Sequence, residues 1–346
     1  RSKCNSKISI FEYVYNNHRR CRFNYSSKSW YRNTGVDMAI GAYRITRANG
    51  ERTPVIDENR NLRIDVIRAP HSAGIEVPLP VGPNAFQGSV SGYVSGGRYG
   101  STDLNAIQKF PFSSDANSTD VGDLTLVRYY VAGSQSTTSG YAFGGTPGVD
   151  RIDKFPFASN DDSTDVGNLF VGRWKLVGMC STTTSYSAGG ITSGFAYTNY
   201  IDKFPFASDG NATDTANLLN SQAISGGNSA QNHGNGYGCG GENNYGGTKF
   251  STIQKFSFAS EGNATNAGDL STASRGGVAS QSSSDHGYST GSAPSSSNII
   301  DKFTFASDAD ATDVGNLSAT HSNAMGNSST THGYSSNNDD VDKFSF

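Results

Sequence analysis

Six copies of one short motif recur along this chain. They read Ile107-Gln-Lys-Phe, Ile152-Asp-Lys-Phe, Ile201-Asp-Lys-Phe, Ile253-Gln-Lys-Phe, Ile300-Asp-Lys-Phe and Val341-Asp-Lys-Phe. Subtracting their first positions gives steps of 45, 49, 52, 47 and 41 residues. Repeats of about 40–50 residues with strand and turn chemistry are typical of β-propeller blades. The repeat predicts the fold but says little about function, because propellers serve as enzymes, lectins and structural rings.

The composition agrees with short strands joined by many turns. Hydrophobic residues make up 34% of the chain, and 41 of its 346 residues are Gly. The net charge of −3 gives no global basic field, so binding of nucleic acid by the whole chain is not expected. No stretch approaches the roughly 20 apolar residues of a membrane span, and no secretory leader is visible.

The four cysteines do not form a recognisable framework. Cys4, Cys21, Cys180 and Cys239 are irregularly spaced and contain no CxxC pair. Isolated thiols are the favoured interpretation, and a Cys4–Cys21 disulfide stays open.

Residues 1–74 differ from the rest of the chain. Residues 1–37 form a basic, aromatic arm, which can bind RNA or DNA but is better explained as a docking or structural arm. Residues 38–74 are expected to be a small β-rich connector or anchor. In it, Leu62–Arg68 has the alternation of a strand, and Asn49-Gly50 is a hairpin turn signal.

The repeat occupies residues 75–346. In the unit after Ile152, residues 152–157 alternate like a strand, with Phe155 and Phe157 on one face. A polar turn follows, then predicted strands at 166–169 and 173–177. Each unit next carries a Tyr, usually followed by two Gly residues, which suits a positive φ or a close backbone approach. The Tyr residues are Tyr93, Tyr141, Tyr186, Tyr237, Tyr288 and Tyr334.

This order of elements resembles the Kelch family of β-propellers. That family has an Arg that opens a strand, an aromatic residue followed by two Gly residues, and a strand that ends in an aromatic residue. Arg128, Arg173 and Arg275 match the opening Arg, while Gln222 and His321 stand there in other units. The family's Trp after the third strand is absent, so the repeats are Kelch-like. The resemblance implies an all-β, Kelch-like propeller.

The units are also similar to repeats in uncharacterised virion proteins of marine bacteriophages, in which strings like Ile201-Asp-Lys-Phe-Pro-Phe-Ala-Ser-Asp-Gly-Asn-Ala-Thr-Asp recur. This resemblance covers residues 75–346. It implies a structural or adhesive role in a tail, fibre or capsid surface, at a virion or extracellular location. Other virion proteins are expected to bind residues 1–74, within a homo-oligomeric assembly.

The ends of the repeat region predict how the ring closes. The last unit ends on its Asp-Lys-Phe strand, and residues 75–81 look like an orphan copy of the short strand that should follow it. We expect six blades, with residues near 75–81 completing the last one and removing two free edges. The alternative is seven blades, with residues 38–74 forming the extra one.

The turn after each Phe-x-Phe strand is a candidate calcium site. Alternating carboxylate and amide oxygens are how calcium loops are built, although the bidentate Glu of an EF-hand is missing. Repeated Asx-type turns that cap their own backbone are the favoured interpretation. The candidate calcium ligands are Asp115, Asp120, Asp209, Asp214, Asp308, Asp310 and Asp313.

The motif lysines are interpreted as packing residues. Each stem is expected to lie on a neighbouring blade while the ammonium group pairs with an acid. The nearby Asp153, Asp202, Asp301 and Asp342 are the candidate partners.

Aromatic residues in or beside variable loops are the candidate ligand-binding set, because such rings stack on sugars. They are Tyr141, Phe143, Phe195, Tyr197, Tyr200, Tyr237 and Tyr245. No nucleophile elbow, HExxH, phosphate loop or sialidase motif is visible. We therefore expect a non-enzymatic structural or adhesive protein that binds a host surface or another protein. A lectin-like propeller is the first alternative, and a propeller hydrolase or oxidase the second.

Overall fold

The computed structural model of the chain describes residues 87–224, 227–243, 247–272, 278–292, 297–337 and 340–346, and six short strands before residue 87. The chain divides into two compact units, Arg1–Leu79 and Pro80–Phe346. All regular elements in the described residues are β-strands. In that part of the chain no helix is long and apolar enough to cross a membrane.

The described strands of the first unit pair as three antiparallel hairpins. They are β1 (Glu12–Tyr15) with β2 (Arg19–Arg22), β3 (Tyr31–Asn33) with β4 (Val36–Met38), and β5 (Arg44–Thr46) with β6 (Arg52–Pro54). Asn49-Gly50 lies between β5 and β6, so the hairpin predicted there is confirmed. The strand predicted at Leu62–Arg68 and the closing strand predicted near 75–81 lie outside the described residues.

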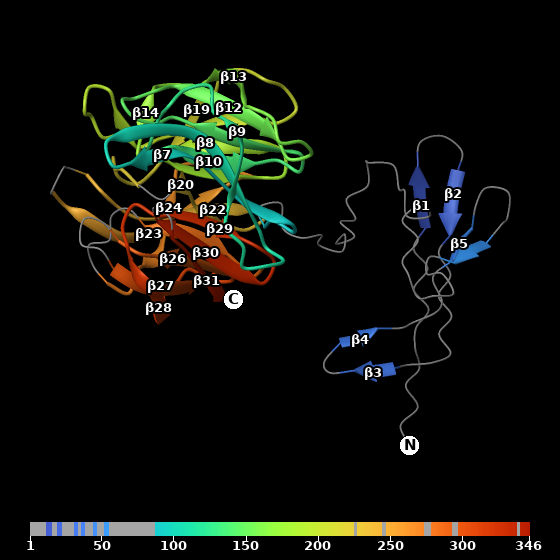
Figure 1. Ribbon diagram of the computed structural model, residues 1–346. Helices are drawn as coiled ribbons and strands as arrows, with labels where there is room; N and C mark the ends of the chain where they lie inside the picture. The colour runs from blue at the N-terminus through green and yellow to red at the C-terminus, as the bar shows by residue number, and fades with distance from the viewer. Residues whose placement is uncertain are drawn as a thin grey trace. The chain divides into compact units, whose positions relative to one another are not determined.

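The described residues of the second unit form a six-bladed β-propeller, as the repeat predicts (Figure 1). Each blade is an antiparallel sheet whose strands follow the chain from the axis to the rim. Blades 1 to 3 are β7 (Ser91–Tyr99), β8 (Thr102–Pro111), β9 (Thr119–Asp123); β10 (Ala132–Gln135), β11 (Ser139–Phe143), β12 (Arg151–Pro156), β13 (Thr164–Asn168); and β15 (Val177–Cys180), β16 (Thr184–Ala188), β18 (Tyr200–Pro205), β19 (Thr213–Asn217). Blades 4 to 6 are β21 (Ala230–Gln231), β22 (Asn235–Glu242), β23 (Lys249–Ser257), β24 (Thr265–Asp269); β25 (Ala279–Ser282), β26 (His286–Thr290), β27 (Ser297–Thr304), β28 (Thr312–His321); and β29 (Met325–Ser328), β30 (His332–Asn337), β31 (Asp340–Ser345).

Short pairings join neighbouring blades near the axis. β20 (Gly227–Asn228) pairs in parallel with β15, and Gly88 forms a parallel bridge to Ser329. A further small sheet pairs β14 (Arg173–Trp174) with β17 (Ile191–Thr192). The strand predicted at 173–177 is therefore wrong: Lys175 has φ of 54°, which breaks the extended backbone before β15 begins.

Antiparallel strands give the propeller two distinct faces. The connection from the second to the third strand and the connection from the outer strand to the next blade lie at one end of each sheet. We call this end the loop face. The turns between the first and second strands and between the third and outer strands lie at the opposite end, which we call the turn face.

The aromatic residues of the repeat hold neighbouring blades together. The Tyr of each second strand packs on the Phe-x-Phe pair of the following blade, as Tyr141 does on Phe204 and Phe206, at 5.6 and 5.0 Å between ring centroids. The same contact closes the ring, because Tyr334 of blade 6 packs on Phe110 and Phe112 of blade 1, at 5.3 and 4.9 Å. Offset ring pairs of this kind stabilise beyond the area that they bury.

Two glycine positions explain the recurring Gly-Tyr and Gly-Gly pairs. A Cβ on Gly140 would lie 2.3 Å from the ring of Phe155, so only Gly leaves room for that ring. Gly144 has φ of 70°, and a Cβ there would lie 2.6 Å from the carbonyl oxygen of Arg173. The predicted positive φ and close backbone approach are both confirmed.

Buried ion pairs occupy two of the three positions of the opening Arg, and the third, Arg275, lies outside the described residues. Arg128 pairs with Asp153 at 2.9 Å and Arg173 with Asp202 at 2.6 Å, and all four side chains are inaccessible to solvent. Arg173 also donates to the carbonyl oxygens of Gly189 and Tyr200. Burial lowers the pKa of Arg173 and raises that of Asp202, while their mutual attraction opposes both shifts.

Candidate functional site

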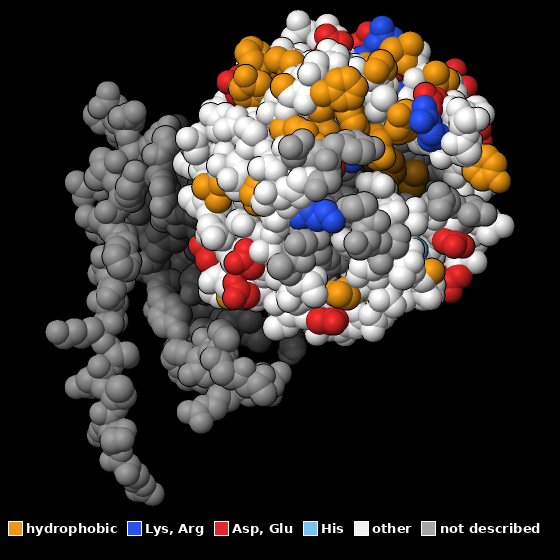
Figure 2. Space-filling view, turned by 90° about the vertical axis from the view of Figure 1, so that its left-hand side faces the viewer, with side chains coloured by type: hydrophobic (Ala, Val, Ile, Leu, Met, Phe, Trp, Pro, Cys, Tyr) orange, Lys and Arg blue, Asp and Glu red, His pale blue; other side chains and the backbone are white. Residues whose placement is uncertain are grey.

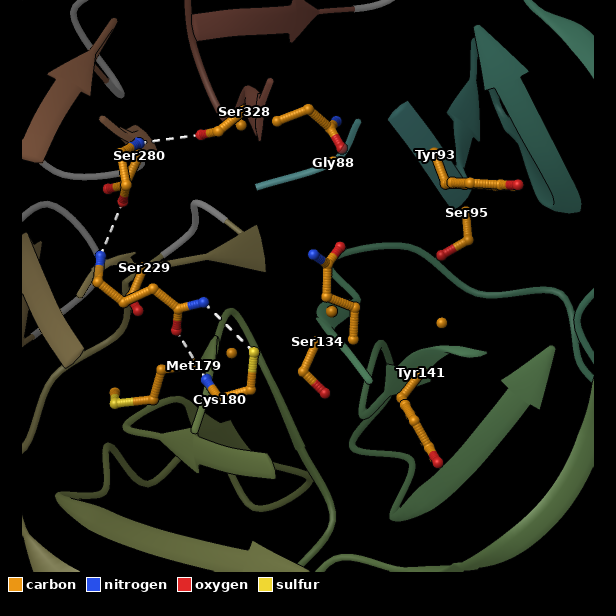
Figure 3. A pocket seen from close by; sticks show the side chains of 18 of the residues that line it. Gly88, Tyr93, Ser95, Ser134, Tyr141, Met179, Cys180, Ser229, Ser280 and Ser328 are labelled. Atoms are coloured by element: carbon orange, nitrogen blue, oxygen red, sulfur yellow. Dashed lines mark hydrogen bonds between the residues drawn. The ribbon is translucent and has the colours of Figure 1, made fainter. Parts of the chain in front are cut away.

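A small cavity lies on the propeller axis (Figure 3). Its volume is about 100 Å³, and its walls come from the inner strands, including Ser134, Cys180, Ser229, Ser280 and Ser328. Sites for organic ligands usually measure ~300–1,000 Å³. The axial cavity therefore suits a few water molecules rather than an organic ligand.

Hydrogen bonds link the inner strands around this cavity. The backbone N–H of Cys180 donates to Gln231 Oε1 at 2.7 Å, that of Gln231 to Ser282 Oγ at 2.8 Å, and that of Ser282 to Ser328 Oγ at 2.9 Å. The N–H of Gly88 then donates to the carbonyl oxygen of Ser328 at 2.8 Å. Burial raises the pKa of the Cys180 thiol, which favours its protonated, unreactive form. The hydrogen bonds around the axis thus join the inner strands of different blades.

A much larger hollow extends from the junction of blades 6 and 1 to the segments that lead into blades 2 and 3. Its volume is about 1630 Å³, and we call it the junction groove. At the loop face it is lined by Tyr99, Tyr129, Tyr130 and Trp174, and toward the turn face by residues such as Asn117. Its size exceeds the ~300–1,000 Å³ of most small-molecule sites, so an elongated ligand fits it better than a compact one.

One wall of the junction groove is aromatic. The rings of Tyr129 and Tyr130 lie 4.8 Å apart, and Tyr130 stacks on Trp174 at 5.6 Å. The guanidinium of Arg98, the residue that precedes Tyr99, lies 3.9 Å from the centre of the Tyr129 ring. Trp174 is fixed from behind by buried Ile191 and Ala223. The wall is therefore held in place without a ligand, which lowers the entropy lost on binding.

Two wall positions carry backbone strain. Tyr130 and Lys175 have φ of 57° and 54°, in the left-handed region, and each stands five residues before the end of an inner strand. At the matching place before β29 the chain has Asn323, a residue type that tolerates this conformation, with φ of 54°. A non-Gly residue held there costs about 1–3 kcal/mol, and such residues cluster at functional sites.

The structure separates the sequence-predicted aromatic residues. Tyr141, Phe143 and Tyr237 are at most 4% exposed and lie in the core between blades, so they are not available to a surface ligand. Tyr200 is half-buried in β18, beside Phe170. On the loop face, Tyr197 is half-buried near Trp174 and Phe195 is 76% exposed. Tyr245 lies outside the described residues.

Sequence reasoning missed the aromatic wall itself. Its signal is the pair of residues that follows each opening position: Tyr129-Tyr130 after Arg128 and Trp174-Lys175 after Arg173, against Ser322-Asn323 after His321. Aromatic residues at a place where other units carry Ala223-Ile224 or Ser322-Asn323 mark a departure from the repeat. Departures of this kind are expected at functional sites.

The turns predicted as candidate calcium loops join neighbouring blades on the turn face. Their first acid pairs with the motif lysine of the preceding blade: Lys154 with Asp209 at 3.0 Å and Lys255 with Asp308 at 2.9 Å, and likewise Lys203 with Glu261 and Lys343 with Asp115. The lysine partners predicted within the same strand are wrong for Lys154, Lys203 and Lys343. Adjacent strand residues point to opposite faces, so Asp153 and Asp202 lie on the other side.

The remaining turn residues bind backbone. Asp310 accepts a hydrogen bond at 3.0 Å from the N–H of Asp269 in the preceding blade. Asp120 and Asp313 cap the N–H groups of Gly122 and Gly315. Asp214 lies close enough to the Arg173–Asp202 pair for its negative charge to act on the pKa of both residues, in the upward direction. The Asx-turn interpretation accounts for these side chains, and within the described ranges no group of three metal-binding residues is found.

Chelation should therefore leave the propeller intact. We expect the thermal midpoint of the full chain in excess EDTA to match that in added calcium within about 1 °C, because no ligand-linked stabilisation is lost. Differential scanning calorimetry on the same dialysed sample gives the comparison. A midpoint that rises steadily with calcium concentration would restore the calcium interpretation of these turns.

No family model matches this chain, and no curated protein matches it at significance. The identification as a six-bladed propeller thus rests on the geometry of the blades.

Proposed function

We propose that the chain is a non-enzymatic adhesive and structural protein of a virus particle, such as a tail, fibre or capsid-surface component. In this proposal, the propeller presents the junction groove to a host surface. Residues 1–74 attach it to other virion proteins. The viral setting rests on the resemblance of the repeats to virion proteins.

The observation that carries the adhesive part is the aromatic wall at the loop face. Tyr99 is 74% exposed there, next to a wall that is already packed and fixed. Large exposed aromatic side chains beside a preformed hollow are typical of binding surfaces. On the turn face, the lysine pairs and Asx turns are used for contacts between blades. The residues of the loop face are not bound to these contacts, and they differ more from blade to blade.

Adhesion is tested with the fluorescently labelled full chain on a panel of intact marine bacterial isolates. We expect saturable binding to some isolates, competed by unlabelled protein. A full chain that binds none of a broad panel, while still folded by circular dichroism, would contradict the adhesive role.

A further inference from the structure

The inner surface of the junction groove is polar as well as aromatic. Besides the aromatic side chains, it is lined by the uncharged side chains of Asn117, Ser118, Asn323 and Asn337. Figure 2 shows that charged side chains are sparse over much of the surface in view, which is dominated by uncharged polar groups and backbone. Amides and hydroxyls both donate and accept hydrogen bonds, so they match hydroxyl groups on a ligand.

The cations that line the groove are already neutralised. Among the described lining residues these are Arg98, Lys175 and Lys343. Arg98 pairs with Asp103 at 2.5 Å, Lys175 with Glu242 at 2.9 Å, and Lys343 with Asp115. An anionic polymer would have to compete with these carboxylates, whereas a neutral ligand leaves every pair intact.

From this lining we infer that the junction groove binds a neutral oligosaccharide of several sugar units. The inference rests on the proposed adhesive function and names its ligand. Sugars offer apolar C–H faces to aromatic rings and hydroxyl groups to amides, and the lining of the groove provides both kinds of side chain. The groove's volume of about 1630 Å³ has room for a chain of sugars rather than a single ring.

Tyr99 is the residue whose loss should reveal this binding. It lines the groove and is 74% exposed, so it can stack on a sugar while contributing little to the core. Phe195 belongs to the ligand-binding set predicted from the sequence, but it does not line the groove. Because it is 76% exposed on the same face, it is the matched control. Replacing either ring with Ala should leave the fold unchanged.

The experiment is a glycan array probed with the full chain, carrying neutral gluco-, manno- and galacto-oligosaccharides and, separately, oligo-uronates. Hits are then measured by isothermal titration calorimetry. We expect binding to at least one neutral oligosaccharide and little to uronates. Tyr99→Ala should weaken it at least tenfold, Tyr99→Phe should retain most of it, and Phe195→Ala should match the natural chain.

Three results would overturn the inference: no neutral oligosaccharide bound, a preference for uronates, or equal affinity of Tyr99→Ala and the natural chain. The bacterial panel separates this failure from that of the proposed function. If the chain binds cells and Tyr99→Ala reduces that binding while no glycan binds, adhesion stands and its ligand is of another class. If the chain binds neither cells nor glycans, both proposals fail.

Discussion

Replacing Arg173 with Met is expected to destabilise the propeller by about 3–5 kcal/mol. The substitution keeps the apolar stem but removes the guanidinium, which leaves the carboxylate of Asp202 buried without its partner. Two backbone carbonyl oxygens also lose a donor. The free energy of unfolding is measured by urea titration of the full chain.

The loss should depend on pH. Burial raises the pKa of Asp202, and Arg173 opposes that shift, so removing Arg173 raises this pKa further. A carboxyl group with a raised folded pKa binds its proton more tightly in the folded state. Its stabilising effect is therefore present at low pH and lost as pH rises through the folded pKa. The deficit of Arg173→Met should be largest near neutral pH and shrink as the pH falls toward 4.

Arg151 provides the control on the preceding blade. It pairs with Asp165 at 3.1 Å, but the two side chains are 32% and 41% exposed. Exposed pairs contribute only ~0–1 kcal/mol, so Arg151→Met should cost little. The double variant Arg173→Met, Asp202→Leu should recover part of the loss, because it removes the unpaired charge. Equal stabilities of Arg173→Met and Arg151→Met would show that the buried pair does not carry this energy.

Replacing Tyr334 with Ala is expected to cost a similar amount, about 3–5 kcal/mol, and to open the ring locally. Tyr334 is 5% exposed and packs on the two Phe rings that begin the repeat. Blades 6 and 1 are not consecutive in the chain, so contacts of this kind join them, together with the Gly88–Ser329 bridge near the axis. Hydrogen exchange should increase most in β7 and β30, measured by mass spectrometry.

Tyr288→Ala distinguishes closure of the propeller from the loss of an aromatic side chain. Tyr288 makes the equivalent contact with Phe344 and Phe346, between blades 5 and 6, which the chain also connects directly. Its loss should lower stability without a selective increase of exchange in β7. Tyr334→Phe, which keeps the ring, should behave like the natural chain. Identical exchange patterns for the two Ala variants would argue against a special role for Tyr334.

The sequence predicts the blades well because their strands carry a strong alternation. Ile152 and Ile201 are fully buried and Phe155 and Phe204 nearly so, because each sheet packs against a blade on both sides. The same packing explains why Tyr141, Phe143 and Tyr237 are core residues and not ligand-binding ones. Tyr141 and Tyr237 are copies of the Tyr that recurs once in every unit, which is more simply explained by the contact that every unit makes.

The junction groove could not be predicted in the same way. It depends on which blades meet where the chain does not connect them, and on turns of the backbone at Tyr130 and Lys175 that the residue types do not favour. The ion-pair partners of the motif lysines could not be predicted from the sequence either. Lys154 reaches Asp209, 55 residues away, and only the three-dimensional stacking of blades brings them together.

The opposite placement of the Asx turns and the aromatic wall has a consequence for how such a ring can diversify. On the turn face, hydrogen bonds from backbone N–H groups to turn side chains join neighbouring blades. The described turns there have nearly the same sequence, as in Asp209-Gly-Asn-Ala-Thr-Asp and Asp308-Ala-Asp-Ala-Thr-Asp. The residues after the opening positions differ from unit to unit without altering those bonds. Under the proposed function, single substitutions there would change the ligand that the propeller binds while the contacts between blades stay the same.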